Sequence, residues 1–210
     1  RDSPLKCIET NVLGTANILE AARHSPMRPW IILGSTRDVP SESYVARSVY
    51  GASWLAAEVF ARRYAEDYGL RVLVLRLSDV YGSPRDHQDK LLPSQVRRAL
   101  SGEGSEDEDQ GQQFDFTWYG DVGEAFRLGA DWVSAQLAGC FGAVTVCTGR
   151  AIGMPELMSL VSHEVASQSV LSLHYPAHRG NLRIPIWNDP APAERLLGFR
   201  AGVSLEEGVR

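Results

Sequence analysis

Apolar residues recur at intervals of three and four along several stretches of the chain, which is the spacing of helices that bury one face. In the first stretch these residues are Leu5, Ile8, Val12, Ala16 and Leu19, and they predict a helix over residues 4–23. Further helices are predicted over 48–68, 93–100, 121–137, 155–167 and 189–198, and a last one is predicted to begin at residue 204.

Three short runs consist almost wholly of apolar residues, at 31–34, 72–75 and 143–147. Such uninterrupted runs are typical of parallel strands that are covered on both faces. Because the runs alternate with helices, the chain is predicted to be an α/β protein. Residues 101–113 contain almost no apolar side chain, and we interpret them as a surface loop.

Composition limits the kinds of partner that the chain can have. Its 210 residues are 44% hydrophobic, which suffices for one main domain, and the net charge is −5. No basic cluster suggests nucleic acid as a partner, and no apolar run approaches the roughly 20 residues that cross a membrane. The three cysteines lack C-x-x-C spacing and lie in apolar patterns, so we expect reduced thiols and a cytoplasmic protein.

Several motifs follow one another in a characteristic order. Residues 50–58 read Tyr-Gly-Ala-Ser-Trp-Leu-Ala-Ala-Glu, residues 11–22 read Asn-Val-Leu-Gly-Thr-Ala-Asn-Ile-Leu-Glu-Ala-Ala, and residues 33–39 read Leu-Gly-Ser-Thr-Arg-Asp-Val. Further motifs lie at 76–82, 115–122 and 196–208. Together they resemble the extended short-chain dehydrogenase/reductase superfamily, specifically its NAD-dependent epimerase/dehydratase family. The resemblance covers nearly the whole chain and implies a Rossmann-like sheet.

The most informative departure from this family is Trp54. In the family the corresponding residue is a lysine, which holds the nicotinamide ribose and favours ionisation of the tyrosine one helical turn earlier. The resemblance also begins midway through the Rossmann half, so the glycine-rich turn that receives a dinucleotide pyrophosphate is expected to be missing. The chain is therefore predicted to bind no NAD and to use no cofactor.

Three more departures replace family residues that contact a nucleotide sugar. Asp79 stands for an asparagine, Phe114 for an arginine and Trp118 for a tyrosine. Aromatic side chains favour flat, apolar ligands. These replacements predict a hydrophobic small-molecule substrate, contacted by Trp54, Phe114 and Trp118.

Two hydroxyl groups are the first candidates for catalysis. An isolated phenol keeps its proton at neutral pH, so Tyr50 is expected to donate a hydrogen bond to a developing oxyanion, with Thr36 as the second donor that the resemblance implies. A base is also needed for isomerisation, and Asp38 is the first candidate and Asp79 the second. The alternatives stay open that the hydroxyls serve only packing and that the acids only form turns.

Three other residues are assigned to substrate binding. Asn11 corresponds to a family asparagine that helps to organise the site, and Ser35 lies beside Thr36. Arg179 resembles a family arginine that meets the substrate phosphate, and it could instead bind a carboxylate or form a surface ion pair. No metal site is predicted, because His174 and His178 have no carboxylate at ligand spacing.

The predicted fold is α/β, a truncated Rossmann-like parallel sheet with flanking helices and a small C-terminal lobe. It is taken as one domain, in which residues 1–150 form the Rossmann-half remnant and 151–210 form an interleaved substrate lobe. Truncation would leave the strand at Ile31 with an unpaired edge. Because exposed edges invite pairing, we expect a rearranged terminal segment or a second copy of the chain to cover it, and we predict a homodimer.

Three functions are compatible with the sequence. The leading interpretation is a cofactor-independent isomerase, cyclase or lyase of natural-product type, in which Tyr50, Thr36 and one aspartate act on a hydrophobic carbonyl compound. The second is a non-catalytic relative that binds a ligand or a partner. The third is an NAD-dependent epimerase whose N-terminal half is missing from this chain.

Overall fold

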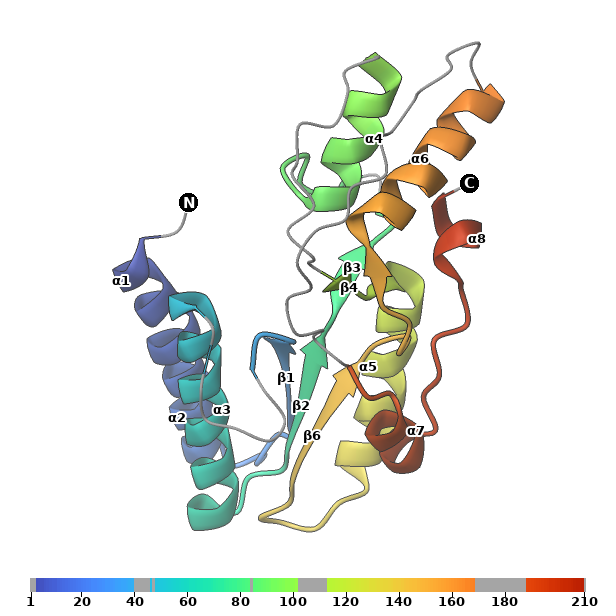
Figure 1. The fold of residues 1–210 in the computed structure, drawn as a ribbon. Coiled ribbons are helices and arrows are strands. Elements are labelled where there is room, and N and C mark those ends of the chain that lie inside the picture. The colour runs from blue at the N-terminus through green and yellow to red at the C-terminus, as the bar shows by residue number, and fades with distance from the viewer. Residues whose placement is uncertain are drawn as a thin grey trace. The chain divides into compact units, whose positions relative to one another are not determined.

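The computed structural model describes residues 3–39, 46, 48–83, 85–101, 113–168 and 188–209, and they form two compact units that alternate along the chain (Figure 1). The first unit contains residues 1–78, 122–146 and 190–200, and the second contains 79–121, 147–189 and 201–210. Residues 79–121, which the sequence assigns to the larger part, belong to the second unit. Most of the predicted loop at 101–113 lies outside the described residues.

A three-stranded parallel sheet forms the centre of the first unit. Its strands are β1 (Ile31–Thr36), β2 (Val72–Leu77) and β6 (Phe141–Val146), in the order β1-β2-β6. Ile31 pairs with Val72, and Val72 pairs with Phe141. The predicted parallel sheet is therefore confirmed, and each strand ends one or two residues away from its predicted end.

Helices cover both faces of this sheet, as uninterrupted apolar strands require. On one face Val72 and Val74 pack with α2 (Gly14–His24) and α3 (Val49–Tyr68), in a buried cluster that includes Leu19 and Ala61. On the other face α5 (Tyr119–Ser134) approaches closely, because a Cβ atom at Gly129 would lie only 2.7 Å from the Leu73 side chain. The remaining helix of the unit is α7 (Ala191–Leu197).

The helix predicted over residues 4–23 has a π-helical interruption. It consists of α1 (Pro4–Cys7), the π-helix η1 (Ile8–Leu13) and α2. At the end of η1 the backbone N–H of Gly14 bonds to the carbonyl of Glu9, five residues earlier, instead of the residue four earlier. Apolar periodicity predicted the extent of this helix but not its interruption.

Helix α3 begins and ends at residues that suit its termini. The Ser48 side chain accepts a hydrogen bond of 3.0 Å from the Gly51 N–H, which satisfies one otherwise unpaired donor of the first turn. At the other end Gly69 has a φ of 72°, a conformation that glycine adopts without strain. The sequence predicted both boundaries to within one residue.

The described residues of the second unit form two small sheets and three helices. Strands β3 (Asp79–Tyr81) and β5 (Phe116–Trp118) pair in parallel, and β4 (Gln113–Phe114) pairs antiparallel with β7 (Ile152–Gly153). The helices are α4 (Leu91–Ser101), α6 (Met154–Gln168) and α8 (Leu205–Val209). Tyr81, Phe116, Ile152, Leu157 and Leu205 belong to its buried core. The sequence missed all four strands because two or three residues are too few to show a periodicity.

None of the helices formed by the described residues is long and apolar enough to cross a membrane. Within the same part of the chain, no group of three or more histidine, cysteine, aspartate or glutamate side chains is arranged to hold a metal ion.

Candidate functional site

The first unit brings six of the predicted site residues into one neighbourhood, at the carboxyl end of β1 and the start of α3. Thr36 is the last residue of β1, and its Oγ1 accepts a hydrogen bond of 3.3 Å from the Asp38 N–H. Asp38 lies against the first turn of α3, because a Cβ atom at Gly51 would be 3.1 Å from its Cβ and from its carbonyl oxygen. The turn that follows Thr36 therefore packs beside the residue that follows Tyr50.

Tyr50 lies in the first turn of α3 with an accessible side chain. Its relative exposure is 41%, high for an aromatic residue in a helix that packs on a sheet. Its ring makes an edge contact with the Trp54 ring, at a centroid distance of 6.4 Å and an interplanar angle of 82°. The phenol is accessible to a ligand, and its neighbour one helical turn later is an uncharged aromatic ring.

Trp54 is partly buried, and its indole N–H is an unusual feature of the first unit. The Nε1 atom is buried and has no hydrogen-bond partner among the described residues. A buried donor without a partner costs about 1–3 kcal/mol of folding free energy. In this conformation the indole N–H therefore contributes no stabilising hydrogen bond among the described residues.

Asn11 connects η1 to α3 through a buried hydrogen bond. Its Nδ2 donates to Ser53 Oγ at 3.0 Å, and Ser53 Oγ donates to the Tyr50 carbonyl at 2.7 Å. Asn11 is the buried residue of η1, and π-helical turns are frequent at functional sites. The Asn11 amide therefore bonds within the protein, to the helix that carries Tyr50, and its role in organising the site stays a prediction.

Ser35 bonds Glu58, which in turn bonds Arg76, and the sequence singled out neither of these partners. Ser35 is only 6% exposed, and its Oγ donates to Glu58 Oε1 at 2.6 Å. The same carboxylate accepts from Arg76 Nη2 at 2.7 Å and from Arg76 Nε at 3.1 Å. Glu58 is the last residue of the family motif at 50–58, and Arg76 is the first residue of the family motif at 76–82. Membership of these motifs was the sequence signal that could have identified them.

The predicted site residues of the second unit have structural partners. Asp79 Oδ2 accepts from the Asp115 N–H at 3.2 Å, and Phe114 stacks on Phe116 with a centroid distance of 5.9 Å. The Trp118 ring fills the space where a side chain at Gly82 would begin, and Gly82 has a φ of 102°.

These contacts place Phe114 and Trp118 against the core of the second unit. The expectation of a hydrophobic substrate rested on these two aromatic residues, and their packing gives an alternative reason for their presence. Arg179 lies outside the described residues.

Asp115, in the same matched motif, is the most buried carboxylate of the second unit at 2% exposure. Its Oδ1 accepts from the N–H and the hydroxyl of Thr148 at 3.0 and 2.7 Å, and its Oδ2 accepts from the Gly149 N–H at 2.9 Å. These bonds fix the turn that follows β6. Asp115 therefore has a structural task within its unit, which the motif alone did not reveal.

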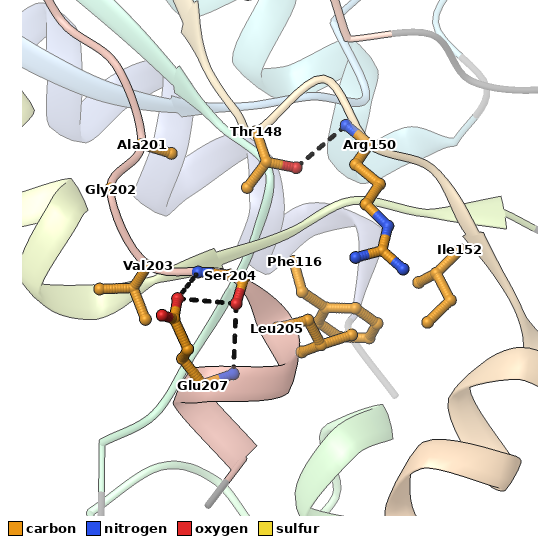
Figure 2. A pocket seen from close by; sticks show the side chains of 10 residues that line it. All are labelled: Phe116, Thr148, Arg150, Ile152, Ala201, Gly202, Val203, Ser204, Leu205 and Glu207. Carbon is orange, nitrogen blue, oxygen red and sulfur yellow. Dashed lines mark hydrogen bonds between the residues drawn. The ribbon is translucent and has the colours of Figure 1, made fainter.

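The second unit also contains a cavity of about 250 Å³ (Figure 2). Its walls come from β5, the segment around β7 and the chain leading into α8; the lining residues include Phe116, Thr148, Arg150, Ile152, Ser204 and Glu207. Polar groups on its wall bond to one another, since Glu207 Oε2 accepts from the N–H and the hydroxyl of Ser204. No sequence-predicted site residue lines the cavity among the described parts of the chain.

The fold is Rossmann-like, since helices cover both faces of a parallel sheet. The hydroxyl of Thr36 at the end of β1 and Tyr50 in the first turn of α3 are the arrangement of the epimerase type. The family model for NAD-dependent epimerases and dehydratases matches residues 1–139. The chain belongs to the NAD-dependent epimerase/dehydratase family, and the resemblance identified from its motifs is confirmed.

Individual relatives agree with this membership. A protein described as a putative UDP-glucose 4-epimerase from Methanocaldococcus jannaschii is 27% identical, over 100% of this chain and 70% of its own length. A dTDP-glucose 4,6-dehydratase from Mycobacterium tuberculosis is 32% identical, over 48% of this chain and 34% of its own length. The solved UDP-glucose 4-epimerase of Thermotoga maritima shares the fold, with a TM-score of 0.80 at 23% identity, and covers 99% of this chain and 69% of its own.

These relatives overturn the leading functional interpretation. A cofactor-independent isomerase, cyclase or lyase was expected because Trp54 replaces a lysine and the glycine-rich turn has no counterpart in the chain. The family and its members are NAD-dependent epimerases and dehydratases, so that interpretation is wrong. Its error was to treat a departure at one position, and the absence of a motif from these 210 residues, as evidence for a different kind of chemistry.

The residues present fit the family's cofactor, NAD, only in part. Tyr50 is partly exposed and lies in the turn of α3 that packs against Asp38, two residues after the end of β1. Trp54, however, places an uncharged ring one turn later, and its indole nitrogen is buried rather than presented to a ribose hydroxyl. At Trp54 the chain does not fit NAD in the manner of the family.

Proposed function

We propose that this chain is the tyrosine-bearing and substrate-side part of an epimerase or dehydratase that acts on a nucleotide sugar. The observation that carries the proposal is the match along the whole chain to a putative UDP-glucose 4-epimerase, combined with the placement of Thr36 and Tyr50 in one neighbourhood. The relatives extend beyond the part that this chain matches. This coverage supports the interpretation that the rest of an NAD-dependent enzyme lies outside these 210 residues.

In this proposal Tyr50 and Thr36 act on one oxygen atom of the sugar. Both hydroxyls can donate a hydrogen bond to an oxygen on which negative charge develops, which stabilises the transition state more than the ground state. Asp38 remains the candidate base in the first unit, since it packs against the start of α3. Asp79 is less suited to that role, because its Oδ2 already accepts from the Asp115 N–H.

A second candidate function is binding of a nucleotide sugar without turnover. Trp54 favours it, because replacing an ammonium by an indole removes the charge that would make the Tyr50 phenol a stronger hydrogen-bond donor. The two candidates share a ligand class and differ in whether product forms.

The experiment incubates the full-length natural protein that contains these residues with UDP-glucose and NAD. It follows UDP-galactose and 4-keto product by chromatography, and binding of UDP-glucose is measured by calorimetry. Turnover that falls at least about 100-fold in Tyr50→Phe, but persists in Tyr68→Phe, supports the first candidate. The control Tyr68 is a similarly exposed tyrosine on the same helix. Binding without product supports the second candidate, and absence of both binding and product contradicts the proposal.

We also propose that two copies of the chain associate. Within the described part of the chain, β1 pairs with β2 on one side only. An open strand edge favours pairing with another chain. Light scattering coupled to size exclusion tests this, and a mass of one chain, 23.1 kDa, at all concentrations would contradict it.

A further inference from the structure

The first unit contains one buried ion pair that links three elements. Arg76 on β2 and Glu58 on α3 bond through two guanidinium nitrogens, and their side chains are 15% and 5% exposed. Ser35 on β1 donates a third hydrogen bond to the same carboxylate. The strand that ends at Thr36 is thereby connected directly to the helix that carries Tyr50 in its first turn.

Stability alone does not account for such a pair. Removing two charges from water costs several kcal/mol per ion, and apolar side chains of similar size often stabilise a fold as well or better. Glu58 avoids the larger penalty of an unpaired buried charge because it accepts from three donors. Unlike apolar packing, the ion pair is directional, because its hydrogen bonds fix the distance and the angle between the groups that they join.

The ion pair lies close to the two candidate catalytic residues along the elements that carry them. Ser35 immediately precedes Thr36 on β1, and Glu58 lies about two helical turns after Tyr50 on α3. Catalytic geometry is sensitive to small displacements, since a shift of about 1 Å in a reacting group can cost about 100-fold in rate. A bond between Ser35 and Glu58 restricts how far Thr36 and Tyr50 can move apart.

A second buried contact acts on the same helix from its other side. Asn11 Nδ2 donates to Ser53 Oγ, which in turn bonds the Tyr50 carbonyl. Helix α3 is thus held to β1 through Glu58 and to η1 through Ser53. Both contacts lie entirely within the first unit.

We propose that Glu58 and Arg76 are positioning residues, which act through Ser35 to hold the Thr36 hydroxyl at a fixed place relative to the Tyr50 phenol. Ser35 is then a buried link and not a contact of the substrate, although the sequence assigned it to substrate binding. The effect on catalysis rests on the proposed function, whereas the effect on the end of β1 does not.

The decisive variant is Ser35→Ala, because it removes one hydroxyl and leaves the ion pair in place. In the full chain we expect kcat for UDP-glucose to fall about tenfold with KM unchanged within twofold, as for an interaction that matters only in the transition state. The matched control is Ser134→Ala, which removes an exposed hydroxyl bonded to the Asp131 carbonyl. The control should leave both constants unchanged.

A second measurement is independent of turnover. The Arg37 N–H bonds the Leu77 carbonyl, and the Asp38 N–H bonds Thr36 Oγ1, so their hydrogen exchange reports on order at the end of β1. We expect exchange at these amides to accelerate at least tenfold in Ser35→Ala and not in Ser134→Ala. The melting temperature should fall by a few degrees in Ser35→Ala, which loses a buried hydrogen bond, and stay the same in Ser134→Ala.

The ion pair itself is tested with Glu58→Gln against Arg127→Gln, which breaks exposed pairs with Glu124 and Asp131. Glu58→Gln should accelerate exchange at Arg37 more than Ser35→Ala does, and the surface variant should not. Unchanged exchange and unchanged kcat in Ser35→Ala would overturn the proposal. If the wild-type chain shows no turnover, the proposed catalytic function fails while exchange alone still decides whether Ser35 and Glu58 order the strand end.

Discussion

Buried polar side chains in the first unit bond mainly to one another, whereas the candidate residues of the second unit pack as rings or hold backbone turns. In the first unit Ser35, Glu58 and Arg76 form one network. In the second unit Trp118 covers Gly82, and Asp115 bonds the turn at Thr148. The difference teaches that departures from the family have separate meanings in the two units. In the second unit they change the packing, and at Trp54 in the first unit the departure changes the charge next to an accessible phenol.

The largest effect is expected in the second unit, at Asp115. Asp115→Ala leaves the N–H and hydroxyl of Thr148 and the N–H of Gly149 without their acceptor, and each unsatisfied buried group costs about 1–3 kcal/mol. We expect a loss of about 3–5 kcal/mol in unfolding free energy, measured by urea denaturation. Asp131→Ala, at an exposed carboxylate, should lose less than about 1 kcal/mol. If both variants lost less than about 1 kcal/mol of unfolding free energy, Asp115 would not have the structural role assigned to it.

The next largest effect is a change in unfolding free energy that has opposite signs for a glycine of the second unit and a glycine of the first. Gly82→Ala places a Cβ atom in the space of the Trp118 ring at a positive φ, so we expect a destabilisation of about 2–3 kcal/mol. Gly123→Ala in α5 meets nothing within 4 Å and should stabilise by about 0.5–1 kcal/mol. Thermal unfolding of both variants measures the two shifts. Equal shifts in one direction would show that Trp118 does not pack as described.

A smaller effect, about tenfold in rate or 1.4 kcal/mol, is expected at Trp54. Trp54→Lys places a cation one turn after Tyr50, which makes the phenol a stronger hydrogen-bond donor and restores the family's charge at this position. We expect kcat at neutral pH to rise and the alkaline limit of the activity to move to lower pH, measured with UDP-glucose and NAD. Trp30→Lys, at an exposed aromatic residue, is the control. An unchanged pH profile in Trp54→Lys would show that the departure has no electrostatic consequence.

The smallest effect concerns Glu20, on the helical side of the first unit. Hydrogen bonds from Arg23 and Tyr64 lower the pKa of Glu20 from 4.5 to about 2. A depressed pKa means that the stabilisation is fully present above pH 4.5 and disappears as the pH falls through about 2. The difference in melting temperature between wild type and Glu20→Gln should therefore be small and shrink over this range. A difference that grows toward acid pH would contradict the assignment.

Sequence reasoning recovered the parts of the fold that repeat a pattern over many residues. The apolar strands at Val72 and Val144 and the capped helix ending at Gly69 were all predicted. The strands of the second unit, such as the pair of Asp79 with Phe116, were not, because their pairing depends on distant contacts and not on periodicity.

For the candidate site, motifs located Tyr50 and Thr36 but could not tell which polar residues are buried partners. Glu58 and Arg76 are 18 positions apart in the chain, and only folding shows that they meet. The functional interpretation went wrong for a related reason. Trp54 is a genuine departure, yet a single replaced residue does not determine the chemistry of a fold whose relatives share one family.

The π-helical turn of η1 has a consequence for insertions and deletions. Its wider winding accommodates one residue more than an α-helical path between the same two ends. A one-residue deletion between Ile8 and Leu13 would let the segment rewind as ordinary α-helix without disturbing Gly14–His24. Each residue of an α-helix turns by about 100°, so the carboxamide of Asn11 would swing away from Ser53. An alignment gap at this point would therefore mark a homologue in which the tyrosine helix has lost one of its two anchors.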